Sequence, residues 1–153
     1  MYPTGTIDQN LTIVQQAIDS TLKEQSRLEN STKLVAVSKT KPRDAIEQAL
    51  KAGQRIFGEN RVKETEQKWL GLKQLYPDTQ LHLIGPLQSN KAALAVSLFD
   101  VIETIDRLKL AKAVSRHIKD TGRNIQCFIQ VNTGEEPQKA GVLPAEADSF
   151  INT

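Results

Sequence analysis

The hydrophobic and polar positions of the chain follow two alternating patterns, one with helical spacing and one of short apolar runs. From about residue 7 to residue 30, apolar residues recur every three or four positions, which predicts an amphipathic helix. Five apolar runs follow, each of a length typical of a strand. They predict strands at residues 34–38, 55–58, 81–85, 100–104 and 125–131.

A helix is predicted after each strand, because apolar residues return to helical spacing there and helix-end residues bound each segment. Strands and helices that alternate regularly are typical of a parallel sheet with helices packed outside it. We therefore predict an α/β fold of five strand–helix units, preceded by an extra N-terminal helix. The predicted helix-end residues are, in order, Pro42 and Gly53, then Asn60, then Ser89 or Asn90, then Asp106 and Gly122, and finally Pro144.

Composition narrows the class of protein without identifying it. The 153 residues suit one domain, and 39% hydrophobic with 25% charged residues is ordinary for a soluble chain. A net charge of +2 gives no electrostatic reason to expect a nucleic-acid or membrane partner. The single cysteine, Cys127, excludes an internal disulfide, and its apolar neighbours predict a buried thiol. With no signal-peptide pattern at the N-terminus, we predict a cytoplasmic protein.

Polar residues follow every predicted strand. Because the carboxyl ends of parallel strands meet at one edge of the sheet, we expect these residues to gather there. The chain has no glycine-rich phosphate loop, dinucleotide fingerprint or paired metal-ligand motif, so neither a nucleotide nor a metal is predicted. The residues at the strand ends are Lys39, then Gly58 to Asn60, then Gly85, Gln88, Asn90 and Lys91, then Asp106 and Arg107, and finally Asn132 and Thr133.

Lys39 ends the first apolar run. A lysine beside a buried strand is costly unless it has chemistry to do, and a neutral lysine amine can add to an aldehyde and form a Schiff base. Burial at the strand end, the like charge of Lys41 and the positive end of the helix that Pro42 opens would each favour the neutral amine. Alternatively, Lys39 buries only its aliphatic stem and keeps its ammonium in water. The placement alone leaves both interpretations open.

Five segments of the chain carry a family resemblance through their order and spacing. They are Val37-Ser38-Lys39-Thr40-Lys41-Pro42, Phe57-Gly58-Glu59-Asn60, the run from His82 to Lys91, Ile105-Asp106-Arg107-Leu108, and the segment from Gln130 to Gly141. Together they resemble the pyridoxal-phosphate (PLP) homeostasis protein family. The resemblance extends from about the first helix to the end of the chain.

The resemblance implies a TIM-type (β/α) barrel like the N-terminal domain of alanine racemase, with PLP held as a Schiff base on Lys39. It implies a non-catalytic protein that buffers PLP or delivers it to PLP-dependent apoenzymes, and so maintains vitamin B6 balance. The alternative is a PLP-dependent enzyme of fold type III, such as a racemase or decarboxylase. Racemases of that kind draw a second catalytic base from another domain, which this sequence does not supply.

The other predicted site residues have structural roles to weigh against functional ones. Asn60 resembles a family residue near the cofactor and is also the predicted helix N-cap, and the two roles can coexist. For His82 we favour a hydrogen-bonded core residue over a proton shuttle, because the sequence shows no paired acid. Gly85 shapes a turn. The predicted cofactor-binding residues are Lys39, Asn60, His82, Gly85, Gln88 and Asn90.

Length sets this sequence apart from the family it resembles. The family domain resembles a barrel of eight strands, and this chain supplies about five. We interpret residues 1–153 as a single PLP-binding domain that is truncated at its C-terminus. By the resemblance, the rest would supply the turns that grip the PLP phosphate and an arginine facing the pyridine nitrogen. We therefore expect this chain alone to bind PLP weakly.

Overall fold

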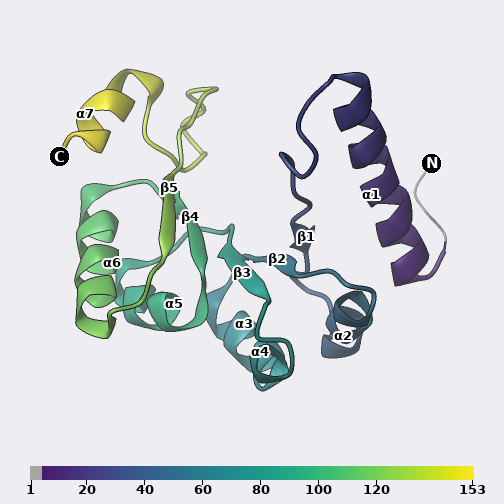
Figure 1. Ribbon diagram of the computed structural model, residues 1–153. Helices are drawn as coiled ribbons and strands as arrows, with labels where there is room; N and C mark the ends of the chain where they lie inside the picture. The colour runs from purple at the N-terminus through teal and green to yellow at the C-terminus, as the bar shows by residue number, and fades with distance from the viewer. Residues whose placement is uncertain (1–4) are drawn as a thin grey trace.

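The computed structural model describes residues 5–153 and confirms the predicted parallel sheet (Figure 1). All five strands are parallel and lie in the order β1-β2-β3-β4-β5, so each strand pairs with its neighbours in the sequence. This is the strand order of a (β/α) barrel wall. The strands are β1 (Ala36–Val37), β2 (Ile56–Glu59), β3 (Gln80–Leu83), β4 (Val101–Ile105) and β5 (Gln126–Ile129).

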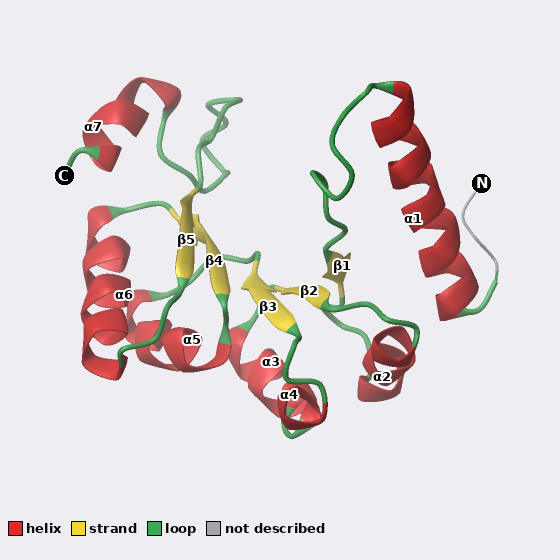
Figure 2. Cartoon of the chain, viewed as in Figure 1, coloured by secondary structure: helices red, strands yellow, loops and turns green. Residues whose placement is uncertain are grey.

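Helices connect consecutive strands and follow one another around the outside of the sheet (Figure 2). Within residues 5–153, none is both long and apolar enough to cross a membrane. The α-helices are α1 (Ile7–Glu24), α2 (Arg43–Lys51), α3 (Val62–Trp69), α4 (Leu72–Leu75), α5 (Ala92–Leu98), α6 (Leu108–Thr121) and α7 (Ala147–Ile151), and the 3-10 turns are η1 (Ser89–Lys91) and η2 (Pro144–Glu146).

The two faces of the sheet have different environments, because strand side chains alternate between them. Toward the helices, Phe57, Leu83 and Ile102 are fully buried, and the Phe57 ring meets Trp69 of α3 edge to face at 5.0 Å. Burying each such side chain contributes about 1.5–3 kcal/mol. On the opposite face, Val37 is 50% exposed and Phe128 is 53% exposed. The core therefore lies between sheet and helices, and the inner face is open at both edges.

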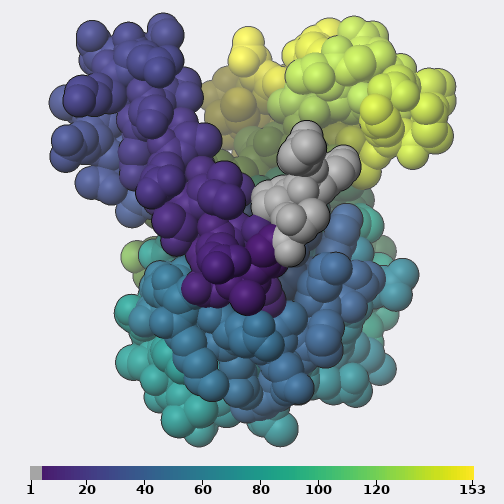
Figure 3. Space-filling model, turned by 90° about the vertical axis from the view of Figure 1, so that its right-hand side faces the viewer, coloured from purple at the N-terminus to yellow at the C-terminus, as the bar shows by residue number. Residues whose placement is uncertain are grey.

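The first helix is shorter than predicted. It ends at Glu24 instead of near residue 30, because Ser26 adopts a left-handed backbone with φ of 49°. The Ser26 and Arg27 N–H groups donate back to the carbonyls of Lys23 and Leu22, which satisfies the last turn. Glycine is the usual residue in that termination motif, so a serine at this position does not predict the end of a helix. Figure 3 shows α1 and the loop after it projecting on one side, with the C-terminal segment projecting on the other.

The prediction of a buried Cys127 is wrong. Cys127 lies on β5 and is exposed. Among residues 5–153, β5 pairs along its length only with β4, and an isolated bridge joins Val131 to Val142 beyond its end. A thiol on an edge strand keeps contact with solvent, even when its sequence neighbours are apolar.

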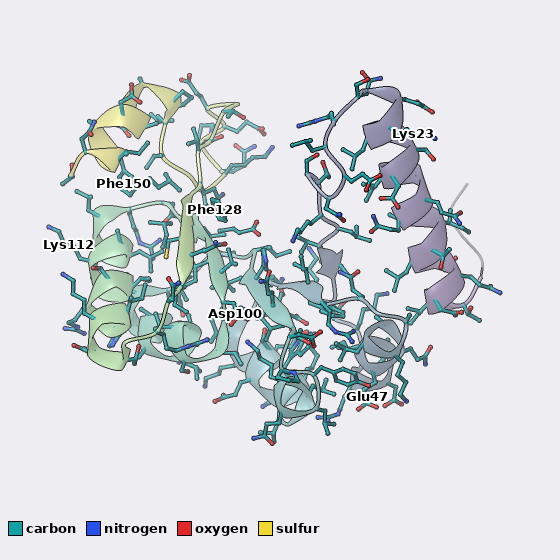
Figure 4. All side chains as sticks on the ribbon, in the orientation of Figure 1. Lys23, Glu47, Asp100, Lys112, Phe128 and Phe150 are labelled. Carbon is teal, nitrogen blue, oxygen red and sulfur yellow. The ribbon has the colours of Figure 1, made fainter. Side chains whose placement is uncertain are left out.

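Asp100 closes the amino-terminal end of β4 (Figure 4). Its carboxylate accepts the Leu81 N–H at 2.8 Å and pairs with Lys73 at 2.6 Å and Arg123 at 3.3 Å. We expect Asp100→Ala to lower the free energy of unfolding by about 1–3 kcal/mol, because a half-buried N–H and two cations lose their acceptor. Urea denaturation measures the change.

The matched control for Asp100 is Asp78, whose side chain is 64% exposed and, in the part of the chain that the structure describes, pairs only with Arg55, at 2.8 Å. An exposed ion pair contributes about 0–1 kcal/mol, so Asp78→Ala should lower the free energy of unfolding by no more than that. Equal losses in the two variants would contradict the role given to Asp100.

Candidate functional site

Lys39 lies two residues beyond the carboxyl end of β1. Its side chain is exposed, so the predicted burial at the strand end is wrong: among residues 5–153, β1 pairs only with β2 and lies at an edge of the sheet. Within residues 5–153, its ammonium makes no hydrogen bond or ion pair. The side chain can therefore meet a ligand without breaking an existing contact.

Asn60 and Gly85 meet at the ends of neighbouring strands. Parallel pairing of Val37 with Gly58 places Lys39 and Asn60 two residues further along adjacent strands. A Cβ atom built on Gly85 would overlap the backbone oxygen of Asn60 and lie 2.7 Å from its Cα, so only glycine permits this approach. Asn60 is not the predicted helix N-cap, because Arg61 holds that position. The buried Asn60 Oδ1 has no hydrogen-bonding partner among residues 5–153.

His82 lies on the open inner face of the sheet, in register with Gly58 on one side and Val101 on the other. Its Nδ1 is 2.6 Å from Oε1 of Glu103, which comes from β4. The expectation that no acid accompanies His82 is therefore wrong. Its side chain is 13% exposed, and its buried Nε2 has no partner among residues 5–153. One ring nitrogen of His82 is thus paired with Glu103, and the other is buried and unpaired among residues 5–153.

Gln88 and Asn90 are exposed at the start of η1. Together with Arg107 and Lys109 at the start of α6 they line a groove of about 570 Å³. Arg107, which is the N-cap of α6 in place of the predicted Asp106, pairs with Asp106 at 2.5 Å and donates to the Leu87 carbonyl at 2.7 Å. The structure joins Asn60 to Gly85 by direct contact, but it places Gln88 and Asn90 in this separate groove.

Beneath the Lys39 turn lies a buried ionic cluster that our sequence reasoning missed. Glu59 is fully buried at the end of β2, where its carboxylate accepts from the Trp69 indole at 3.2 Å. Lys68, which is 13% exposed, pairs with Glu59 at 2.9 Å and with Glu64 at 3.1 Å. Two features of the sequence could have indicated this cluster. One is a glutamate inside the apolar run 56–59, and the other is a Glu–Lys pair four residues apart.

The Glu64 carboxylate has a lowered pKa. The main cause is a hydrogen bond from the Thr40 N–H, and the second is the Lys68 ammonium. Because the folded pKa lies below the unfolded one, the interaction stabilises the fold at neutral pH. That contribution is lost as the pH falls through the folded pKa.

Comparison with known proteins places the chain in a family. Residues 13–153 match the family model described as alanine racemase, N-terminal domain. The chain therefore belongs to the alanine racemase N-terminal domain family, and the five-stranded parallel wall is the corresponding part of that fold. Among the residues described, no group of three or more histidine, cysteine, aspartate or glutamate side chains could hold a metal ion.

Relatives within this family carry the name that the sequence motifs suggested. The pyridoxal phosphate homeostasis protein of Haemophilus influenzae is 41% identical over 140 residues, which cover 92% of this chain and 59% of that protein. PipY of Synechococcus elongatus PCC7942, solved without PLP, is 42% identical with a TM-score of 0.75, covering 86% of this chain and 61% of PipY. The PLP-bound PipY structure is 40% identical, with a TM-score of 0.73. The chain thus spans about 60% of the length of these relatives.

Proposed function

We propose that this chain binds PLP through the amine of Lys39 and holds or delivers the cofactor without catalysing turnover, as a cytoplasmic protein of vitamin B6 homeostasis. The observation that carries the proposal is the exposed Lys39 ammonium at a barrel strand end, which has no partner among residues 5–153. PipY, 40% identical, has been solved with PLP bound, and the Haemophilus relative is named for PLP homeostasis.

The residues present fit an aldehyde cofactor. Lys39 would hold PLP through its side-chain amine, and the cofactor would supply an aldehyde, a group with which a lysine amine bonds covalently and reversibly. Among residues 5–153, two buried polar atoms have no hydrogen-bonding partner, Asn60 Oδ1 just beyond β2 and His82 Nε2 on the adjacent strand β3, and either could bind a polar group of a ligand. The close Gly85–Asn60 contact fixes the position of Asn60, whereas Gln88 and Asn90 line the separate groove beside α6.

Trapping the adduct tests the proposal. After addition of PLP, borohydride reduction and peptide mapping should place the label on Lys39, and Lys39→Ala should abolish that label. Lys41→Ala is the matched control, because Lys41 is exposed two residues away on the same turn. It should leave Lys39 labelling within about twofold, as expected for a surface substitution. Label spread evenly over the exposed lysines would contradict the proposal, because Lys39 would then react no differently from an ordinary surface lysine.

A second candidate function, a PLP-dependent racemase or decarboxylase, is favoured by the His82–Glu103 pair. A histidine oriented by a carboxylate can hold or move a proton at its free nitrogen. An assay of amino-acid α-proton exchange separates the two functions. The carrier proposal predicts no sustained exchange in the PLP-loaded protein, whereas exchange that is lost in His82→Phe would establish the enzyme.

A further inference from the structure

Ser38, which precedes Lys39, is held by groups beyond its own strand. Its N–H donates to the Gly58 carbonyl at 3.0 Å, as strand pairing requires. In addition, its hydroxyl donates to Glu59 Oε1 at 2.7 Å, and the Lys68 ammonium donates to its carbonyl at 2.9 Å. Three separate contacts therefore fix the residue on one side of Lys39.

Thr40, which follows Lys39, is held by a residue of α3, the helix that also carries Lys68. Its N–H donates to Glu64 Oε1 at 2.9 Å, and the Lys41 N–H donates to the Ser38 carbonyl at 3.1 Å, closing the turn. Thr40 has a φ of 64°, a left-handed conformation that is unfavourable for a non-glycine residue. Such a conformation persists only where the surroundings enforce it.

Lys68 joins these two anchors. It lies one turn after Glu64 on α3, and its ammonium contacts Glu59, Glu64 and the Ser38 carbonyl at 2.9, 3.1 and 2.9 Å. Both carboxylates that hold the Lys39 turn are therefore tied to one cation. Among residues 5–153, none of these groups makes a hydrogen bond or ion pair with the Lys39 ammonium.

We propose that Lys68 is a positioning residue for the Lys39 amine, acting through Glu59 and Glu64 on the residues flanking it. This inference rests on the proposed function. The cluster fixes the turn, and so the direction in which the Lys39 side chain leaves the backbone. Reactions between positioned groups lose rate steeply when one of them is misplaced, by up to about a hundredfold per ångström.

The test compares the reactivity of Lys39 with that of Lys41 in one folded sample. Each variant is treated with PLP and borohydride under conditions where circular dichroism shows it to be folded, and both labels are quantified by peptide mapping. In Lys68→Met, which keeps the stem and removes the ammonium, the Lys39:Lys41 labelling ratio should fall about ten- to a hundredfold. Glu64→Ala, which leaves Lys68 paired with Glu59, should lower the ratio in the same direction if Lys68→Met does not fold.

Two controls separate positioning from general stability. Lys63→Met removes an exposed lysine of the same helix and should leave the ratio unchanged. Asp100→Ala destabilises the opposite end of the sheet and should also leave the ratio unchanged in the folded protein. If Lys39 is selectively labelled in the unmodified protein but the Lys39:Lys41 ratio is unchanged in Lys68→Met and Glu64→Ala, the positioning role of Lys68 is contradicted and the proposed function is not. If Lys39 is not selectively labelled in the unmodified protein, the proposed function is contradicted, and with it the positioning role that rests on it.

Discussion

Gly85→Ala should lower the free energy of unfolding by about 1–3 kcal/mol or more, because the surrounding backbone leaves no space for the added methyl group. The new Cβ would overlap the Asn60 backbone oxygen and lie 2.7 Å from the Asn60 Cα and Cβ. Backbone atoms cannot turn aside as the end of a flexible side chain can. The two strand ends would have to separate, which should also displace the Asn60 side chain. Urea denaturation measures the loss of stability.

Gly58→Ala is the matched control on the adjacent strand. Its Cβ would lie 3.1 Å from Ile84 Cδ1 and 3.3 Å from Val35 Cγ1, and both are ends of side chains that can shift by a few tenths of an ångström. We expect a loss of less than about 1 kcal/mol, typical of a tolerated core substitution. A loss at Gly58 as large as that at Gly85 would contradict the steric account.

Glu59→Ala should be the most damaging substitution in the cluster, with a loss of about 3–5 kcal/mol, because removing one partner of a buried ion pair leaves the other charge uncompensated. The variant leaves the Lys68 ammonium short of an acceptor, and the Ser38 hydroxyl and Trp69 indole lose theirs. The same urea titration measures the change in stability.

Glu66→Ala supplies the reference for that loss, because Glu66 is exposed on the adjoining helix α3 and should cost less than about 0.5 kcal/mol. The double variant Glu59→Leu/Lys68→Met removes both charges and should lose less than the sum of the two single substitutions. Additive losses would show that the two side chains do not interact energetically.

The arrangement of the chain could be predicted because it rests on local patterns. Alternating strand and helix periods specify five β/α units, and the observed strands all overlap the predicted ones. The strand end that carries Lys39 follows from the same pattern. The ends of the helices were harder to predict. Helix α1 ends at a left-handed serine, Ser26, instead of a glycine, and Arg61 replaces Asn60 as the N-cap of α3.

The parts of the site that could not be predicted depend on contacts between strands and helices distant in the sequence. Glu103 meets His82 from 21 residues away, and the pairing requires the β3–β4 register. Lys68 reaches the Ser38 carbonyl from 30 residues away. Exposure depends in the same way on position in the sheet: Lys39 and Cys127 are exposed because each belongs to an edge strand or follows one.

A crystal structure of the protein grown with PLP would show directly whether Lys39 holds the cofactor. We expect continuous electron density joining the Lys39 Nζ to the cofactor at the carboxyl end of the sheet, with Asn60 and His82 on the same side. PLP joined to another lysine, or bound away from the end of β1, would contradict it.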